Sequence, residues 1–207
     1  EIVLDALVWS KTPRGRVLYH YGQTVTLKAH IPPAPPAFSS IVPDIGGEVV
    51  PGSVLYKDGT LFHGPSFQGV DQLLHIRREG LVMRCRLAEV PAQRQGQFPV
   101  RTLNPYIYDA IVQCLLIWSQ HFYQAPCLPS RMKELEQYRP VLFDQPYRVE
   151  MKIHSETESS VVGDITVQDE EGRLCLHIRE LEGTISKYLA RRMLHPLADS
   201  AVPTSDG

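Results

Sequence analysis

Two polar side chains, Asp109 and Gln113, interrupt the most apolar stretch of the sequence, which runs from Tyr106 to Trp118. Residues four apart lie on one face of a helix, so Gln113 is expected beside Asp109, one turn further on. Because an ionised carboxylate is costly in apolar surroundings, such a group finds partners or keeps its proton. A carboxylic acid that keeps its proton near neutral pH can serve as a general acid. Asp109 is therefore a candidate general acid with Gln113 as its partner; the alternative is a structural Asp109 that faces solvent or caps a loop.

A second candidate group is His63, which lies in the segment Leu61-Phe-His-Gly-Pro-Ser-Phe67. The Gly-Pro pair predicts a turn, and the two phenylalanines are expected to pin that turn to the core. His63 is then either presented to a pocket or hydrogen-bonded to a nearby backbone group. The residue types alone leave both interpretations open.

The apolar stretch is expected to be a helix that begins at Asn104-Pro105. Asparagine is a favoured N-cap residue, and proline is favoured at the first helical position. A helix that is apolar almost all the way round has no face for solvent, so it is expected to be buried on every side. Such a helix must be enclosed by other elements.

Much of the remaining chain alternates apolar and polar residues, which is typical of antiparallel strands with one side facing water. Strands are expected at residues 2–9, 23–30, 69–77, 80–87, 147–154, 161–167 and 173–181. One buried helix among many antiparallel strands indicates an α+β fold of the hotdog type. In this fold an antiparallel sheet wraps around a long buried central helix.

Dense prolines separate the first two predicted strands from the rest. Residues 31–53 include the run Ile31-Pro-Pro-Ala-Pro-Pro-Ala-Phe38. Proline cannot donate to a sheet ladder, so this segment is expected to be a Pro-rich linker. The last residues, 191–207, are small and polar with prolines, and they are expected to form a flexible tail.

Composition excludes several classes of function. The 207 residues contain 21 Lys+Arg against 23 Asp+Glu, which leaves no basic excess for binding nucleic acid. The longest mostly apolar run, residues 110–118, is far shorter than the roughly 20 residues of a membrane span. The four cysteines show no CxxC spacing, which argues against a zinc site. Without a secretion signal, buried reduced thiols and a cytoplasmic location are expected.

Taken together, these pieces resemble the dehydratase domains of polyketide synthases and of polyunsaturated fatty acid synthases, over about residues 54–188. Members of this family are double hotdogs. Their second hotdog carries His-Pro and then a helical Asp-x-x-x-Gln or Asp-x-x-x-His, which residues 104–113 match with asparagine in place of the first histidine. The family's Tyr-Gly-Pro-x-Phe is matched by residues 63–67, with histidine in place of tyrosine. A third element, Leu-Pro-Phe-x-Trp, is only echoed by Leu128-Pro129.

The resemblance implies loss of water from a 3-hydroxyacyl thioester carried on an acyl carrier protein. Asp109 would be the general acid, and Gln113 would orient it or the leaving water. A turn formed by Gly64 and Pro65, with His63 and Phe67, would shape the acyl tunnel. No metal or diffusible cofactor is implied, because the phosphopantetheine arm arrives with the substrate. The implied partners are the acyl carrier protein and neighbouring synthase domains, and a homodimer stays open.

The family's catalytic base is a histidine in the pattern His-x-x-x-Gly-x-x-x-x-Pro in the first hotdog. None of the eight histidines of this chain lies in that pattern. We therefore expect residues 1–30 to be the closing strands of a truncated first hotdog and residues 54–190 to be mainly the second hotdog, with the histidine upstream of Glu1. The alternatives are a non-catalytic structural or carrier-docking module, and a hotdog thioesterase or product-template domain.

Overall fold

The chain divides into two units, Glu1–Pro33 and Ala34–Gly207. The computed structural model describes residues 1–35, 49–97 and 99–188. Each unit is presented by itself, because the positions of the two relative to one another are not determined. The predicted tail and most of the predicted Pro-rich linker lie outside the described residues.

The first unit is an antiparallel hairpin of β1 (Ile2–Lys11) and β2 (Val17–Leu27). The chain reverses in the turn Thr12-Pro-Arg-Gly15, where the Gly15 N–H donates to the Thr12 carbonyl at 2.9 Å. Gly15 has φ +78°, a backbone conformation that glycine adopts without steric cost. The second strand begins six residues before the predicted one, because the sequence Val17-Leu-Tyr-His-Tyr21 is rich in residues that favour strands.

The second unit contains a seven-stranded antiparallel sheet in the order β3-β4-β5-β7-β8-β9-β6. Its strands are β3 (Val50–Pro51), β4 (Val70–Arg77), β5 (Gly80–Cys85), β6 (Cys127–Gln137), β7 (Tyr147–Glu156), β8 (Ser160–Gln168) and β9 (Leu174–Ile185). Its helical segments are α1 (Gly52–Lys57), η1 (Pro65–Phe67), η2 (Ala92–Arg94) and α2 (Pro105–Tyr123). The hairpin β4–β5 and the meander β7–β8–β9 confirm the strands predicted for these regions.

Helix α2 begins where the sequence predicts. The Asn104 side chain accepts a hydrogen bond from the Ile107 N–H at 3.3 Å, and Pro105 occupies the first turn. The helix ends at Gln124, which adopts a left-handed conformation (φ 50°) and donates its N–H to the Gln120 carbonyl. Helix α2 is 19 residues long and therefore runs one and a half turns beyond the apolar stretch that predicts it.

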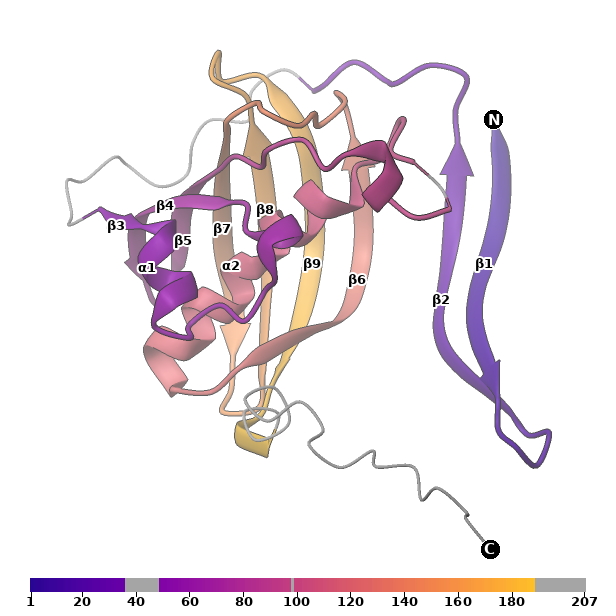
Figure 1. Ribbon diagram of the computed structural model, residues 1–207, viewed down its shortest axis with the longest axis horizontal. Helices are drawn as coiled ribbons and strands as arrows, with labels where there is room; N and C mark the ends of the chain where they lie inside the picture. The colour runs from indigo at the N-terminus through magenta and orange to yellow at the C-terminus, as the bar shows by residue number, and fades with distance from the viewer. Residues whose placement is uncertain (36–48, 98, 189–207) are drawn as a thin grey trace, which may run out of the picture. The chain divides into compact units, whose positions relative to one another are not determined.

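The core forms between α2 and the face of the sheet that curves around it (Figure 1). Ile111, Cys114 and Trp118 of the helix are fully buried, as are Val149, Ile165 and other inward-facing residues of the strands. In β8 burial alternates at every residue, as expected for a strand with one wet side. The architecture confirms the predicted α+β hotdog fold.

Two parts of the second unit differ from the sequence-based prediction. The sequence does not predict the edge strand β6, because its exposed half carries charged residues and a proline at a register shift instead of an apolar alternation. Such residues are common on edge strands, where they discourage pairing with other chains. Residues 50–53, the end of the predicted linker, form β3 and the first residues of α1.

Candidate active site

The predicted pair of Asp109 and Gln113 comes together on α2. Gln113 Nε2 donates to Asp109 Oδ2 at 3.0 Å, which confirms the expected stacking. The two residues differ in burial: Gln113 is 2% exposed, whereas the Asp109 side chain is 36% exposed. Asp109 therefore lies at the edge of the core, with a buried amide holding one of its oxygens.

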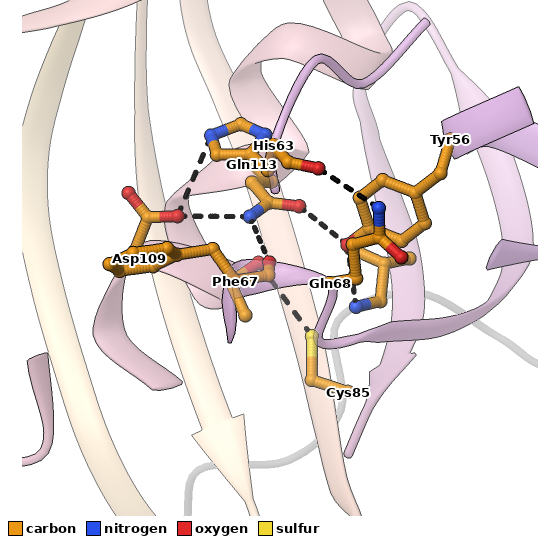
Figure 2. A network of polar contacts seen from close by, with 9 residues as sticks. Tyr56, His63, Phe67, Gln68, Cys85, Asp109 and Gln113 are labelled. Atoms are coloured by element: carbon orange, nitrogen blue, oxygen red, sulfur yellow. Dashed lines mark hydrogen bonds and ion pairs between the residues drawn. The ribbon is translucent and has the colours of Figure 1, made fainter. Parts of the chain in front are cut away.

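The Gln113 side chain is held by three hydrogen bonds (Figure 2). Besides its bond to Asp109, Nε2 donates to the Phe67 carbonyl at 2.9 Å, and Oε1 accepts from the Tyr56 hydroxyl at 2.8 Å. These contacts join α2 to η1 and α1, which are distant in sequence. All hydrogen-bonding atoms of the buried amide are thereby in use, as a buried polar group requires.

Tyr56 belongs to α1 and is not among the predicted site residues. Its hydroxyl accepts a hydrogen bond from the Val70 N–H at 3.0 Å and donates to Gln113. Burial raises the pKa of Tyr56 well above its ordinary value, so the hydroxyl keeps its proton. No motif in the sequence around Tyr56 points to this role, because the contact depends on how α1 packs beside α2.

His63 faces Asp109, which answers the question that the sequence leaves open. Its Nε2 lies 3.5 Å from Asp109 Oδ2, which is longer than an ordinary hydrogen bond. The ring stacks on Phe62 with centroids 4.4 Å apart. Its buried Nδ1 has no hydrogen-bond partner. Burial lowers the pKa of His63, and the nearby Asp109 offsets this only in part, so the imidazole is neutral near pH 7.

The predicted turn residues form η1 and its approach. Gly64 is the N-cap of η1, Pro65 occupies the first position, and the Phe67 N–H donates to the Gly64 carbonyl at 2.9 Å. The Phe67 ring packs on Tyr106 of α2, with centroids 5.0 Å apart. Their placement against α2 agrees with the expectation that they lie near Asp109; a role in shaping an acyl tunnel stays a prediction.

Close packing fixes the distance between this turn and α2. Gly69 is buried, and a Cβ built there would lie 2.6 Å from the Cβ of Ala110. Real Cβ atoms do not approach this closely, so any larger residue would push the η1 segment away from the helix. The Phe67 carbonyl would move with it. The absence of a side chain at Gly69 therefore allows the Phe67 carbonyl to lie within hydrogen-bonding distance of Gln113.

His63 should make the stability of the domain depend on pH. An unfolded histidine binds a proton near its ordinary pKa of 6.5, whereas folded His63 binds one only at lower pH. Between these values the unfolded chain holds more protons, so the free energy of unfolding rises with pH. We expect urea midpoints measured from about pH 8 to about pH 5 to fall less in a His63→Tyr variant than in the wild type.

The matched control is His121→Tyr, which makes the same exchange at an exposed position. Because His177 is a buried histidine whose pKa burial lowers, some pH dependence should remain in the His63→Tyr variant. Identical pH dependence in the wild type and His63→Tyr would contradict the burial of a neutral imidazole at this site.

The arrangement offers a carboxyl group, a neutral imidazole and a fixed amide, which together suit proton transfer. The described residues contain no cluster of three or more His, Cys, Asp or Glu that could hold a metal ion. Among the helices of the described part of the chain, none is long and apolar enough to cross a membrane. The four cysteines are buried and unpaired, and burial raises the pKa of Cys175 to about 11.

Comparison with known structures gives similar folds among polyketide synthase dehydratase domains. A dehydratase domain of a trans-AT polyketide synthase from Brevibacillus brevis superposes with a TM-score of 0.70 at 18% identity, over 89% of this chain and 65% of that one. The dehydratase domain of RzxB from Pseudomonas fluorescens gives a TM-score of 0.61 at 15% identity, over 87% of this chain and 63% of that one. At 15–18% sequence identity, this similarity shows that the chain shares the fold of these domains.

A sequence relative is a polyunsaturated fatty acid synthase from Thraustochytrium sp., one polypeptide of which is 28% identical to this chain over 141 residues. The match covers 67% of this chain and 5% of that polypeptide, so the chain corresponds to a small part of its relative.

The family model that matches residues 33–191 is described as the polyketide synthase dehydratase N-terminal domain. This description differs from our expectation of mainly the second hotdog, although it agrees on the family. The matched range begins just after the hairpin of β1 and β2 and includes every element that builds the site, from α1 to α2. On this match and on the shared fold, the chain belongs to the polyketide synthase dehydratase family.

Proposed function

We propose that this chain supplies the general acid of a dehydratase that acts on 3-hydroxyacyl thioesters carried on an acyl carrier protein, within a polyketide or polyunsaturated fatty acid synthase. The observation that carries the proposal is the environment of Asp109. Its Oδ2 is held by Gln113, whereas its Oδ1 has no hydrogen-bond partner among the described residues. A partly exposed carboxyl with one oxygen held and one free can be presented to a substrate hydroxyl.

In the proposed reaction, a base removes the α-proton of the acyl chain and Asp109 donates a proton to the β-hydroxyl. The C–O bond breaks, the α,β double bond forms, and water leaves. We place the base on a histidine upstream of Glu1, as the family resemblance implies. His63 is assigned to the acyl-binding wall with Gly64, Pro65 and Phe67, as the family resemblance implies, and its Nε2 lies 3.5 Å from Asp109 Oδ2.

The acyl group would reach this site on the phosphopantetheine arm of a carrier protein. The chain would therefore bind the carrier protein and contact neighbouring synthase domains. The same proposal includes the formation of a homodimer. The family resemblance supports these partners. The hydrogen bonding of Asp109 supports its role as the general acid.

The test is product analysis by mass spectrometry with the full-length protein and a 3-hydroxyacyl thioester on its carrier. The proposal requires an enoyl product that is lighter by one water and still attached to the carrier. A free acid would indicate a thioesterase, and a cyclised product would indicate a product-template activity. No conversion of any 3-hydroxyacyl thioester would favour a non-catalytic docking module.

A further inference from the structure

We propose that Tyr56 is a positioning residue for this acid: its hydroxyl sets the orientation of the Gln113 amide, which in turn holds Oδ2 of Asp109 and leaves Oδ1 free to face the substrate. This inference rests on the proposed function. It concerns a residue on α1, a short helix that precedes β4 and η1 in the chain. Tyr56 and Gln113 belong to the hydrogen-bond network shown in Figure 2.

The first step concerns the single hydroxyl hydrogen of Tyr56. The Val70 N–H is a backbone donor and lies 3.0 Å from the hydroxyl oxygen, which must accept this bond. The hydroxyl hydrogen is therefore free to point at the other neighbour, the Gln113 side chain, 2.8 Å away. Because that hydrogen is a donor, the atom of Gln113 that faces Tyr56 is the amide oxygen.

The second step concerns the amide nitrogen of Gln113. With Oε1 toward Tyr56, both hydrogens on Nε2 point at acceptors, the Phe67 carbonyl at 2.9 Å and Asp109 Oδ2 at 3.0 Å. The opposite orientation would place Oε1 against two oxygens and would leave the Phe67 carbonyl without its donor. Since Gln113 is 2% exposed, water cannot easily replace the lost bond.

The third step concerns the two carboxyl oxygens of Asp109. Oδ2 of Asp109 accepts an N–H from Gln113, so a proton on Oδ2 could not point along the same line. His63 Nε2 also lies on the side of Oδ2, at 3.5 Å. The remaining oxygen, Oδ1, has no partner among the described residues. Oδ1 is therefore the carboxyl oxygen that no described residue holds and that is available to a substrate.

The groups around the Asp109 carboxyl come from α1, η1 and α2 and from the loop before η1. They are Tyr56 on α1, His63 before η1, the Phe67 carbonyl on η1, and Gln113 on α2 itself. Because burial keeps the Tyr56 hydroxyl protonated by raising its pKa, its donation to Gln113 persists throughout the pH range in which a dehydratase works. The orientation of the amide is then independent of pH.

The chain offers a matched control for Tyr56. Tyr108 is also half-buried and donates its hydroxyl to a glutamine oxygen, Gln137 Oε1, at the same distance of 2.8 Å. Burial raises its pKa as it does that of Tyr56. Tyr108 points from α2 toward β6 instead of toward Asp109. Tyr56→Phe and Tyr108→Phe each remove a hydroxyl-to-glutamine hydrogen bond, of which only the first belongs to the proposed acid. Tyr56→Phe also removes the acceptor of the Val70 N–H.

The kinetic experiment compares both variants in the full-length protein with a 3-hydroxyacyl thioester. We expect Tyr56→Phe to lower kcat about 10-fold, the order of loss that one hydrogen bond implies when the group it orients in turn holds the acid. KM should stay within about 2-fold, because Tyr56 does not touch the substrate. Tyr108→Phe should leave kcat unchanged. Both variants should lose resistance to urea, and Tyr56→Phe should lose more, because it also leaves the buried Val70 N–H without its acceptor. An unchanged kcat in Tyr56→Phe, or an equal loss in Tyr108→Phe, would overturn the proposal.

A second measurement on this chain does not need activity. In ¹⁵N-labelled wild type, both side-chain amide protons of Gln113 should exchange slowly with solvent, because both are hydrogen-bonded within the core. Exchange should accelerate at least about 10-fold in Tyr56→Phe and stay as in the wild type in Tyr108→Phe. Rapid exchange of the wild-type amide would contradict the proposed orientation even if Tyr56→Phe failed to fold.

These measurements separate the inference from the function on which it rests. If Asp109→Asn retains dehydration, the proposed function fails, and this inference fails with it. If Asp109→Asn is inactive and Tyr56→Phe turns over like the wild type, the function stands and only the role of Tyr56 is refuted.

Discussion

Replacing Asp109 with asparagine should lower the rate of dehydration by about 10²–10⁴-fold, the usual contribution of a positioned general acid. Asparagine has almost the same shape, and its side-chain oxygen can still accept the hydrogen bond that Gln113 Nε2 donates to Asp109. It has no acidic proton to give to the departing hydroxyl. The measurement is single-turnover conversion of a carrier-bound 3-hydroxyacyl thioester by the full-length protein, with urea unfolding to show that the variant folds.

Asp71→Asn provides the matched control, because Asp71 is an exposed aspartate on β4. The same change of charge there should leave turnover within about 2-fold of the wild type. Turnover near the wild-type rate in Asp109→Asn would remove Asp109 from the mechanism. Equal losses in both variants would attribute the effect to net charge instead of to proton donation.

Replacing Trp118 with alanine should lower the free energy of unfolding by about 3–5 kcal/mol. Trp118 lies at the centre of the α2 contact with the sheet and is 0% exposed. Its ring packs against Phe122 and Tyr123, and its Nε1 donates to the Arg77 carbonyl at 2.9 Å. Alanine would leave a large cavity and would remove the hydrogen bond to the Arg77 carbonyl at the end of β4. Urea denaturation followed by circular dichroism measures the loss.

Trp118→Phe separates the two contributions, because phenylalanine fills much of the space but cannot donate to Arg77. We expect this variant to lose about 0.5–1.5 kcal/mol, the net contribution of one hydrogen bond, because the acceptor belongs to an exposed residue. If Trp118→Ala unfolds at the same urea concentration as the wild type, α2 is not the central packing element described here. Equal losses in the two variants would mean that the hydrogen bond dominates and that the cavity closes.

The central helix and most strands could be predicted because their signals are local. Asn104-Pro105 predicts the start of α2, because asparagine is a favoured N-cap residue and proline is favoured in the first turn. The pairing of Asp109 with Gln113 follows from helical spacing alone. Strand β8 could be predicted because burial on one face imposes a period of two on its residues. Strand β6 carries a weaker signal, because an edge strand is half solvated.

The sequence alone determined the fold class, the start of α2 and the presence of a carboxyl beside an amide on one helix face. Only the tertiary structure decided that His63 faces Asp109, that Tyr56 donates to Gln113 and that one Asp109 oxygen remains free. Tyr56 and Gln113 are 57 residues apart, and no local pattern records which residues of α1, η1 and α2 will touch. Hydrogen-bond direction depends on that packing, so the chemistry of the site emerges only once the core has closed.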